Sequence, residues 1–150
     1  MIEKQAMTLI SGTRFRLRSP FYLILVFWHS YWSSRQLSDA NGFLNVKFLK
    51  EANWLVFWSV TAWQNESSMN NYKNTGAHRR AMPLLSLMCN EASTVRWEQE
   101  ETTLPDWQTV HKLMSENGNF YNLSNPSENH LKRQITLPQI SDLREIQSKK

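Results

Sequence analysis

The chain of 150 residues has the length of one ordinary domain, and its seven Trp, seven Phe and four Tyr indicate a well-filled core. Four Gly and five Pro exclude collagen-like and low-complexity classes, and the single Cys89 excludes an internal disulfide or a multi-cysteine zinc site. The net charge of +4 gathers in residues 132–150, which carry five basic and two acidic side chains. We therefore expect no nucleic-acid partner, because such a surface places its positive charge on the folded body.

The chain begins with residues 1–11, which we predict to be a loosely held leader without the features of a signal peptide, so we expect a cytoplasmic protein. The alternation over 13–19 predicts a strand with Arg14, Arg16 and Arg18 on one face. Three arginines on a central strand must meet carboxylates, reach solvent or hold an anionic ligand. Pairing with acidic side chains is the expected outcome.

A helix is predicted over about 20–37, with Ser19 as its N-cap and Pro20 at its first position. Its apolar side chains form two stripes, which predict that the helix is covered on more than one side. The stripes are Phe21, Leu25, Trp28 and Trp32, and Ile24, Phe27 and Tyr31. The apolar run at 21–28 is much shorter than the roughly 20 residues of a membrane span, so at most peripheral membrane contact is left open.

The following residues predict strands over 43–49 and 54–63, joined by a hairpin turn. The second of these is apolar on both faces, as a central strand is. Helices follow over about 65–74 and 77–89, the latter with Pro83 inside it, and then a strand over 91–98. A further amphipathic helix begins at Pro105–Asp106 and stops at Asn117–Gly118. Residues 131–150 form a polar tail, which we expect to be partly disordered past about 141.

This order of elements is the β-α-β-β-α-β motif, so we predict an α+β fold with a ferredoxin-like antiparallel sheet and an extra C-terminal helix. A sheet of this type has its helices on one face, and here the other face is apolar as well. A second copy of the sheet is the simplest cover, which predicts a homodimer that forms an α/β barrel. The domain is expected to span 12–130.

Residues 57–82, FWSVTAWQNESSMNNYKNTGAHRRAM, resemble the antibiotic-biosynthesis monooxygenase superfamily of dimeric α/β barrels. The shared pattern is a strand ending in Trp63, then Glu66, an apolar and an aromatic residue on the helix, and a small-His-Arg helix start. Segments 34–35, 42–44 and 91–98 fit the same pattern. The "GAHRRAMP" box at 76–83 and the "LPDW" helix at 104–111 resemble a bacterial subgroup near spheroidene monooxygenase. The resemblance spans roughly residues 12–130.

The resemblance implies the fold and the dimer, but it leaves the activity open. Members include cofactor-free oxygenases of aromatic polyketides or quinols, haem-degrading enzymes and proteins without a known reaction. One expectation is therefore a monooxygenase-like protein that binds a flat hydrophobic molecule, such as an aromatic, quinone, polyene or tetrapyrrole, with no cofactor or with haem. The alternative is a non-catalytic ligand-binding or scaffold domain of the same fold.

His78 is the leading candidate for chemistry, because it follows a glycine at a helix start and titrates in the range that suits proton transfer or iron ligation. It could instead cap or pack locally. In the haem-degrading branch an iron-ligating His lies one helical turn later, where this chain has Met82, so that activity is not expected. Met82 could be a soft ligand or core filler.

Trp58 and Tyr72 are the expected walls of a pocket for a flat substrate, whereas Trp63 is expected in the core. Arg35 could bind the substrate or complement the helix dipole. No glycine-rich phosphate loop, nucleophile elbow or metal-spaced histidine pair occurs, since His29, His78, His111 and His130 lie far apart in sequence. A dedicated protein metal site is therefore not predicted.

Overall fold

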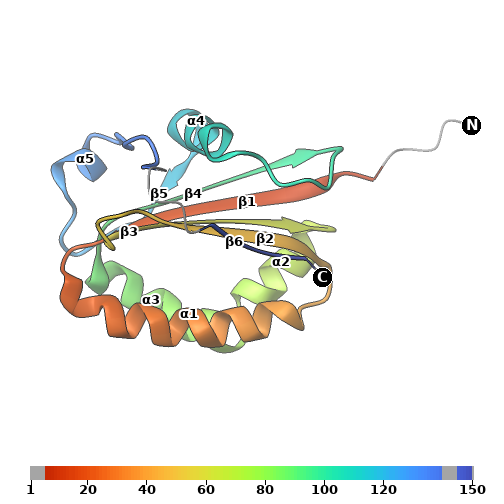
Figure 1. Ribbon diagram of the computed structural model, residues 1–150, viewed down its shortest axis with the longest axis horizontal. Coiled ribbons are helices and arrows are strands. Elements are labelled where there is room, and N and C mark those ends of the chain that lie inside the picture. Colours follow the sequence, from red (N-terminus) through yellow and green to blue (C-terminus); the bar gives the residue numbers. More distant parts are fainter. Residues whose placement is uncertain (1–5, 140–144, 150) are drawn as a thin grey trace, which may run out of the picture.

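A computed structural model describes residues 6–139 and the backbone of 145–149. One antiparallel sheet has the strand order β5-β4-β1-β3-β2-β6 and lies between two layers of helices (Figure 1). The strands are β1 (Thr8–Leu17), β2 (Phe43–Lys50), β3 (Val56–Trp63), β4 (Cys89–Gln99), β5 (Asn119–Phe120) and β6 (Glu145–Lys149). The inner order β4-β1-β3-β2 is that of the predicted ferredoxin-like α+β fold, which is confirmed.

The sheet departs from the prediction at two strand ends. β1 begins at Thr8, inside the predicted leader, and its Leu9 and Ile10 are buried. β3 begins at Val56 rather than at residue 54, because Trp54 has a positive φ of 61° in the preceding turn and is exposed. As predicted, β3 is central, with β1 on one side and β2 on the other.

Three longer helices, α1 (Leu23–Ser38), α2 (Glu66–Lys73) and α3 (Gly76–Met88), cover one face of the sheet (Figure 1). The predicted cap is confirmed, since the Ser19 hydroxyl accepts from the Phe21 N–H in the short 3₁₀ turn Pro20–Tyr22. At the start of the helix predicted from residue 65, the Asn65 side chain accepts from the Ser68 N–H. These polar side chains fix where the helices begin, because they satisfy backbone donors that have no partner inside the helix.

The two apolar stripes of α1 are not both covered. All seven of their side chains are exposed, whereas the buried residues of α1 are Val26 and Leu37. Periodicity identified which residues share a face of this helix, but it placed the wrong face against the sheet. The inward face contains serines and a histidine because it borders a cavity, which is described below.

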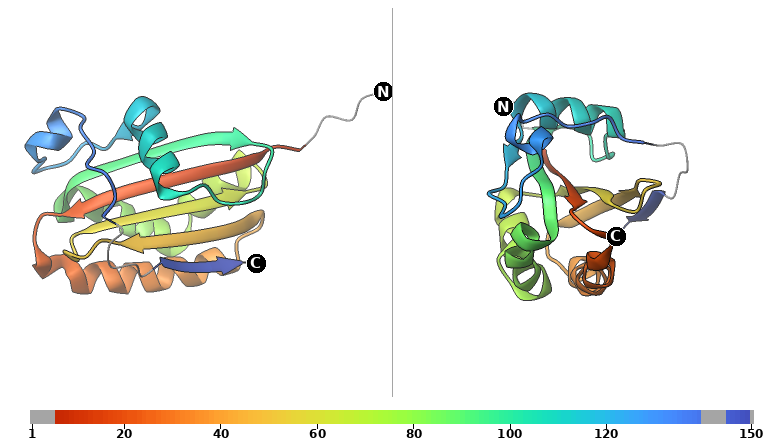
Figure 2. Two further views of the ribbon diagram at one scale, coloured as in Figure 1. Left: turned by 45° about the horizontal axis from the view of Figure 1, so that its top comes forward. Right: turned by 90° about the vertical axis from the view of Figure 1, so that its left-hand side faces the viewer.

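The opposite face of the sheet is covered by helix α4 (Trp107–Asn117), which the Asp106 side chain caps at the Thr109 N–H (Figure 2). Trp107, Val110 and Met114 pack on the strands and are at most 3% exposed. The packing is close, since Cγ1 of Val110 lies 2.9 Å from the position that a Cβ on Gly12 would take. The same chain therefore covers much of the apolar face that was assigned to a second copy, and that argument for a dimer no longer holds.

The segment after α4 is also tied to this face. His130, in the short helix α5 (Glu128–Leu131), is bonded to the Tyr121 carbonyl, and His111 to the Ile135 carbonyl, each at 2.8 Å. β6 extends the sheet at the edge of β2, so the expected disorder does not apply to 145–149. The other residues past 139 lie outside the described part of the chain.

Of the arginines predicted to pair with acidic side chains, Arg14 forms a buried ion pair, whereas Arg18, just after β1, donates to the Leu87 carbonyl at 2.7 Å. The Nη1 of Arg14 lies 2.8 Å from Oε1 of Glu91, and its Nη2 donates to the Thr136 hydroxyl at 3.2 Å. The Ser127 hydroxyl donates to the other Glu91 oxygen at 2.8 Å. One charge pair therefore joins β1, β4 and the C-terminal segment.

Candidate functional site

A cavity of about 670 Å³ lies between α1, α3 and the sheet. Its floor is the face of β1 and β3 that points away from α4, and it includes Thr13, Phe15, Phe57, Thr61 and Trp63. Its walls come from α1 and α3, which are far apart in the sequence but pack side by side (Figure 2). A cavity of this size suits a small organic molecule, for which pockets of about 300–1,000 Å³ are usual.

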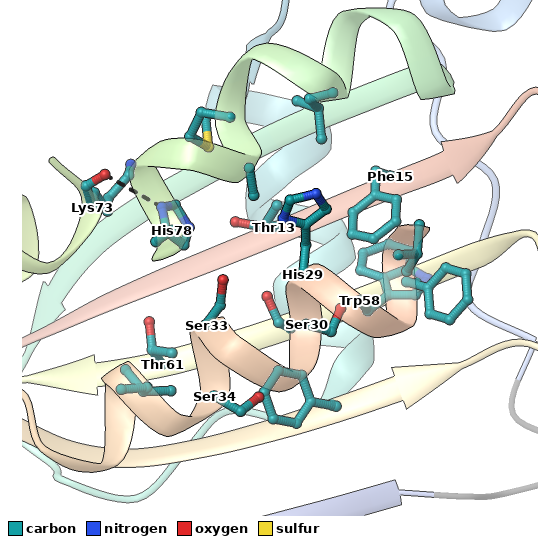
Figure 3. A pocket seen from close by; sticks show the side chains of 18 of the residues that line it. Thr13, Phe15, His29, Ser30, Ser33, Ser34, Trp58, Thr61, Lys73 and His78 are labelled. Carbon is teal, nitrogen blue, oxygen red and sulfur yellow. Dashed lines mark hydrogen bonds between the residues drawn. The ribbon is translucent and has the colours of Figure 1, made fainter. Parts of the chain in front are cut away.

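The inward stripe of α1 gives this apolar cavity its polar groups. His29, Ser30 and Ser33 recur at helical spacing between the buried Val26 and Leu37 (Figure 3). Small hydroxyl side chains leave space where a core helix would place leucine, so the cavity is a direct consequence of this stripe. They also offer hydrogen bonds to a ligand that is otherwise held by apolar contact.

His78 faces the same cavity from the first turn of α3 (Figure 3). Its backbone N–H donates to Oε1 of Gln36 on α1 at 2.9 Å, and its Nδ1 lies 3.4 Å from the Lys73 carbonyl oxygen. Burial lowers the pKa of His78 below its ordinary value of 6.5, so the neutral ring is favoured near pH 7. A carbonyl oxygen only accepts, so the tautomer with its proton on Nδ1 would donate to Lys73 and leave the Nε2 lone pair free. His78 can therefore act as a base or as a ligand.

Tyr72 positions His78 by packing. The two rings lie 4.9 Å apart at 50°, and the Tyr72 ring also lies 5.4 Å from that of Trp63. The Tyr72 hydroxyl donates to the Ser33 carbonyl at 3.1 Å, and burial raises the pKa of the phenol. Tyr72 is therefore an aromatic wall of the cavity, in the position the sequence predicted, and remains a neutral phenol over the physiological range.

Met82 lines the cavity one helical turn after His78. An imidazole with a free Nε2 and a nearby thioether are both donors that haem iron accepts, so this pair of side chains is compatible with haem. A bound haem would supply oxygen-activation chemistry, while His78 would hold the iron. In the described residues, no three His, Cys, Asp or Glu side chains are grouped as a protein metal site requires.

Two predicted site residues do not present their polar groups to the cavity. Arg35 does not line the cavity: it is exposed on α1, and its Nη1 donates to the Tyr31 hydroxyl at 3.1 Å. Trp58 borders the cavity, but its indole contacts α4, 6.4 Å from the Trp107 ring, and its Nε1 donates to Glu51 at 2.7 Å. The alternation of β3 explains this, because Phe57 and Ser59, on either side of Trp58, take the cavity face.

His29 is the residue that the sequence analysis missed. Its distance from His78 along the chain hid the fact that α1 and α3 bring both to one cavity. A signal was present, because Val26, His29 or Ser30, Ser33 and Leu37 form one stripe at i, i+3/i+4 spacing. Treating that stripe, rather than the aromatic ones, as the inward face would have identified it.

No protein family model matches the chain, and no curated protein does. Solved structures are similar, however. A proposed antibiotic biosynthesis monooxygenase from Nitrosomonas europaea matches with a TM-score of 0.57 and 11% identity, over 69% of this chain and 100% of that chain. SnoaB, a cofactor-independent oxygenase from Streptomyces nogalater, matches with a TM-score of 0.51 and 14% identity, over 67% of this chain and 100% of that one. A protein of unknown function from N. europaea matches with a TM-score of 0.53 and 12% identity, over 69% and 99%.

The chain has the fold of these proteins. At such identities the similarity establishes the ferredoxin-like α+β architecture, and it does not establish an activity. Each neighbour is matched almost entirely by about two thirds of this chain, so the chain contains additional structure that they lack.

Proposed function

We propose that this protein binds a flat hydrophobic molecule in the cavity between α1, α3 and the sheet, and oxygenates it with His78 as the base. The observation that supports this most is that a mostly apolar cavity has the imidazole of His78 on its wall, where the tautomer protonated on Nδ1 would leave Nε2 free to accept a proton. The similarity in fold to SnoaB makes cofactor-free oxygenation the reaction to test first.

The residues suit a substrate whose acidic CH₂ group lies next to an aromatic carbonyl. Nε2 of His78 would take one proton from that group, and the resulting anion would give an electron to dioxygen. Overall the CH₂ group becomes C=O, one atom of O₂ enters the product, and the other leaves as water. The aromatic walls Tyr72 and Trp63 would hold the ring system, and burial would exclude bulk water from the anion.

The neutral state of His78 is what this step requires. A protonated imidazole has no lone pair to accept the substrate proton, and burial favours the neutral form. The hydroxyls of Ser30 and Ser33 across the cavity would donate to the carbonyl oxygen that gains charge in the anion. His29 would be a second proton acceptor on the same side.

The test uses anthrone, a tricyclic ketone with an acidic CH₂, as the probe, with oxygen uptake and anthraquinone formation as readouts. We expect catalysed uptake with wild type, a loss of roughly 10²-fold or more with His78→Ala, and retained binding by tryptophan quenching. His111→Gln is the matched histidine control, since His111 lies outside the cavity. Anthrone binding without catalysis would contradict oxygenation and favour the non-catalytic binding domain.

Haem is tested separately by titrating the protein with hemin and recording the Soret band. If iron binds at His78, wild type will show a shifted band that His78→Ala lacks, whereas Met82→Leu will move it little. An identical titration for wild type and His78→Ala would remove His78 as a haem ligand. This outcome would leave the cofactor-free reaction as the one under test.

A further inference from the structure

The outward surface of α1 is apolar and aromatic. Its side chains follow the helix at i, i+3/i+4 spacing, on the side opposite the cavity stripe. The residues of this surface, called the α1 outer surface here, are Phe21, Ile24, Leu25, Trp28, Tyr31 and Trp32. Phe21 and Ile24 are 81% exposed and Trp28 is 61% exposed, so these side chains have no cover from their own chain. A contiguous apolar patch of this kind marks an interaction site.

The charged side chains on α1 and α3, the two helices of this layer, are all basic. Arg35 continues the stripe after Tyr31, and Arg79 and Arg80 are exposed on α3, which packs beside α1 in the same layer (Figure 1). Neither α1 nor α3 contains an Asp or Glu, and Asp39 comes only at the C-cap of α1. α1 therefore presents aromatic and cationic groups, α3 adds cationic groups, and neither helix contributes a carboxylate.

The cavity opens next to this surface. Some of its lining side chains are also exposed, which marks the mouth along the flank of α1: Phe27, Ser30, Tyr31, Ser34 and Trp54. Tyr31 belongs both to the mouth and to the α1 outer surface. A lipophilic molecule beside α1 could therefore enter the cavity without crossing water.

We propose that the α1 outer surface docks on an anionic lipid bilayer, with α1 lying in the plane of the interface. Trp and Tyr side chains favour the level of the lipid headgroups, Phe and Ile favour the acyl boundary, and the arginines meet lipid phosphates. No helix in the described part of the chain is long and apolar enough to cross a bilayer, so the contact is peripheral. The inference does not depend on the reaction in the cavity.

Charge argues against a second copy of the chain as the occupant. A two-fold contact through this surface would place the layer containing Arg35, Arg79 and Arg80 against its own copy. Like charges would then meet across the interface, and neither α1 nor α3 supplies a carboxylate to separate them. A bilayer with anionic headgroups provides both the apolar layer and the counter-charge.

The test measures co-sedimentation of the full chain with vesicles of mixed phosphatidylglycerol and phosphatidylcholine. We expect the double variant Ile24→Ser with Trp28→Ser to bind roughly tenfold or more weakly, because two anchors are lost. Arg79→Gln with Arg80→Gln should weaken binding to these vesicles, and added salt should do the same to wild type. Leu131→Ser is the matched control, since Leu131 is 70% exposed on α5, away from α1. Circular dichroism verifies that each variant is folded.

The results separate the possible occupants. Absence of wild-type binding to the mixed vesicles would overturn the proposal, and equal binding to pure phosphatidylcholine would overturn the anionic assignment. A soluble dimer that Ile24→Ser with Trp28→Ser dissociates, without vesicle binding, would assign the surface to a second copy. Anthrone oxidation is measured without vesicles, so its failure is distinguishable from failure of membrane docking.

Discussion

The side chain of Gln36 on α1 holds the backbone of His78 in place, because the Gln36 Oε1 accepts a hydrogen bond from the His78 N–H at 2.9 Å. The amide nitrogen of the same side chain donates to the carbonyls of Tyr72 at 3.0 Å and Thr75 at 2.8 Å. One side chain thus joins the helix that supplies the serines of the cavity to the α2–α3 junction that supplies its imidazole.

Replacing this side chain should loosen the site and the fold together. We expect Gln36→Ala to lower the free energy of unfolding by about 1–3 kcal/mol, since three backbone groups each lose one hydrogen bond. Anthrone should also bind more weakly, because the first turn of α3 is released. Urea unfolding and tryptophan quenching measure the two effects, with Ser38→Ala on the exposed end of α1 as the control. Unchanged binding would show that His78 is positioned by packing alone.

The buried ion pair between Arg14 and Glu91 should be sensitive to the loss of one partner. Arg14→Met leaves a buried carboxylate uncompensated, which costs about 3–5 kcal/mol, whereas Arg14→Met with Glu91→Leu should recover at least about 1 kcal/mol of that. Urea unfolding is the measurement. The exposed pair of Arg96 and Glu66, at 3.3 Å, is the control, and Arg96→Met should cost less than about 1 kcal/mol. A double variant as unstable as Arg14→Met would contradict this account.

The packing of α4 against the sheet can be tested by a substitution at Gly12. A Cβ there would lie 2.9 Å from Cγ1 of Val110, and a valine side chain has little freedom to move away. Gly12→Ala should therefore destabilise by about 1–3 kcal/mol through overpacking, and should cost less in a Val110→Ala background. Equal costs in the two backgrounds would mean that α4 does not pack against this strand.

The pH dependence of stability should report the burial of His78. Its pKa is lowered in the folded protein, so the unfolded chain takes up this proton first as the pH falls. The neutral ring contributes its full stability above pH 6.5, the pKa of His78 in the unfolded chain. This contribution is lost as the pH falls from 6.5 toward the lower pKa of His78 in the folded protein. The slope reaches at most about 1.4 kcal/mol per pH unit for one proton. His78→Gln should lack this component in urea unfolding between neutral and mildly acidic pH, and equal slopes would contradict it.

The sequence predicted those features that local chemistry determines. Ser19 was predicted as a cap, and the helices predicted to begin near Asn65 and Asp106 are capped by those side chains. A side-chain oxygen beside free N–H groups at a helix start needs no tertiary information. The central position of β3 followed from a strand that is apolar on both faces. His78 was chosen because it follows a glycine at a helix start, and Tyr72 was chosen as an aromatic wall; both line the cavity.

Features set by long-range packing were not predictable in the same way. The sequence of α1 shows an aromatic face and a face with serines, but the pattern alone does not say which of them packs against the sheet. The face with Ser33 does, and its small side chains leave a cavity there instead of a filled core. The position of α4 on the opposite face of the sheet depends on the conformation of the loop from Gln99 to Asp106. Hydrophobic periodicity gives no information about that loop. The homodimer was predicted because that face of the sheet was expected to be uncovered. Since α4 covers it, the dimer stays a prediction that sedimentation can test.

The cavity itself can be tested by filling it from α1. Ser33 is half-buried on the cavity wall, and its backbone carbonyl accepts a hydrogen bond from the Tyr72 hydroxyl. We expect Ser33→Phe to place its ring in the cavity and weaken anthrone binding by at least roughly tenfold, while stability changes by less than about 1.5 kcal/mol because apolar area is buried where space exists. Ser38→Phe, exposed on the same helix, should leave binding as in wild type. If Ser33→Phe binds anthrone normally, the ligand lies outside this cavity, and the roles assigned here to His78 and Tyr72 fall with it.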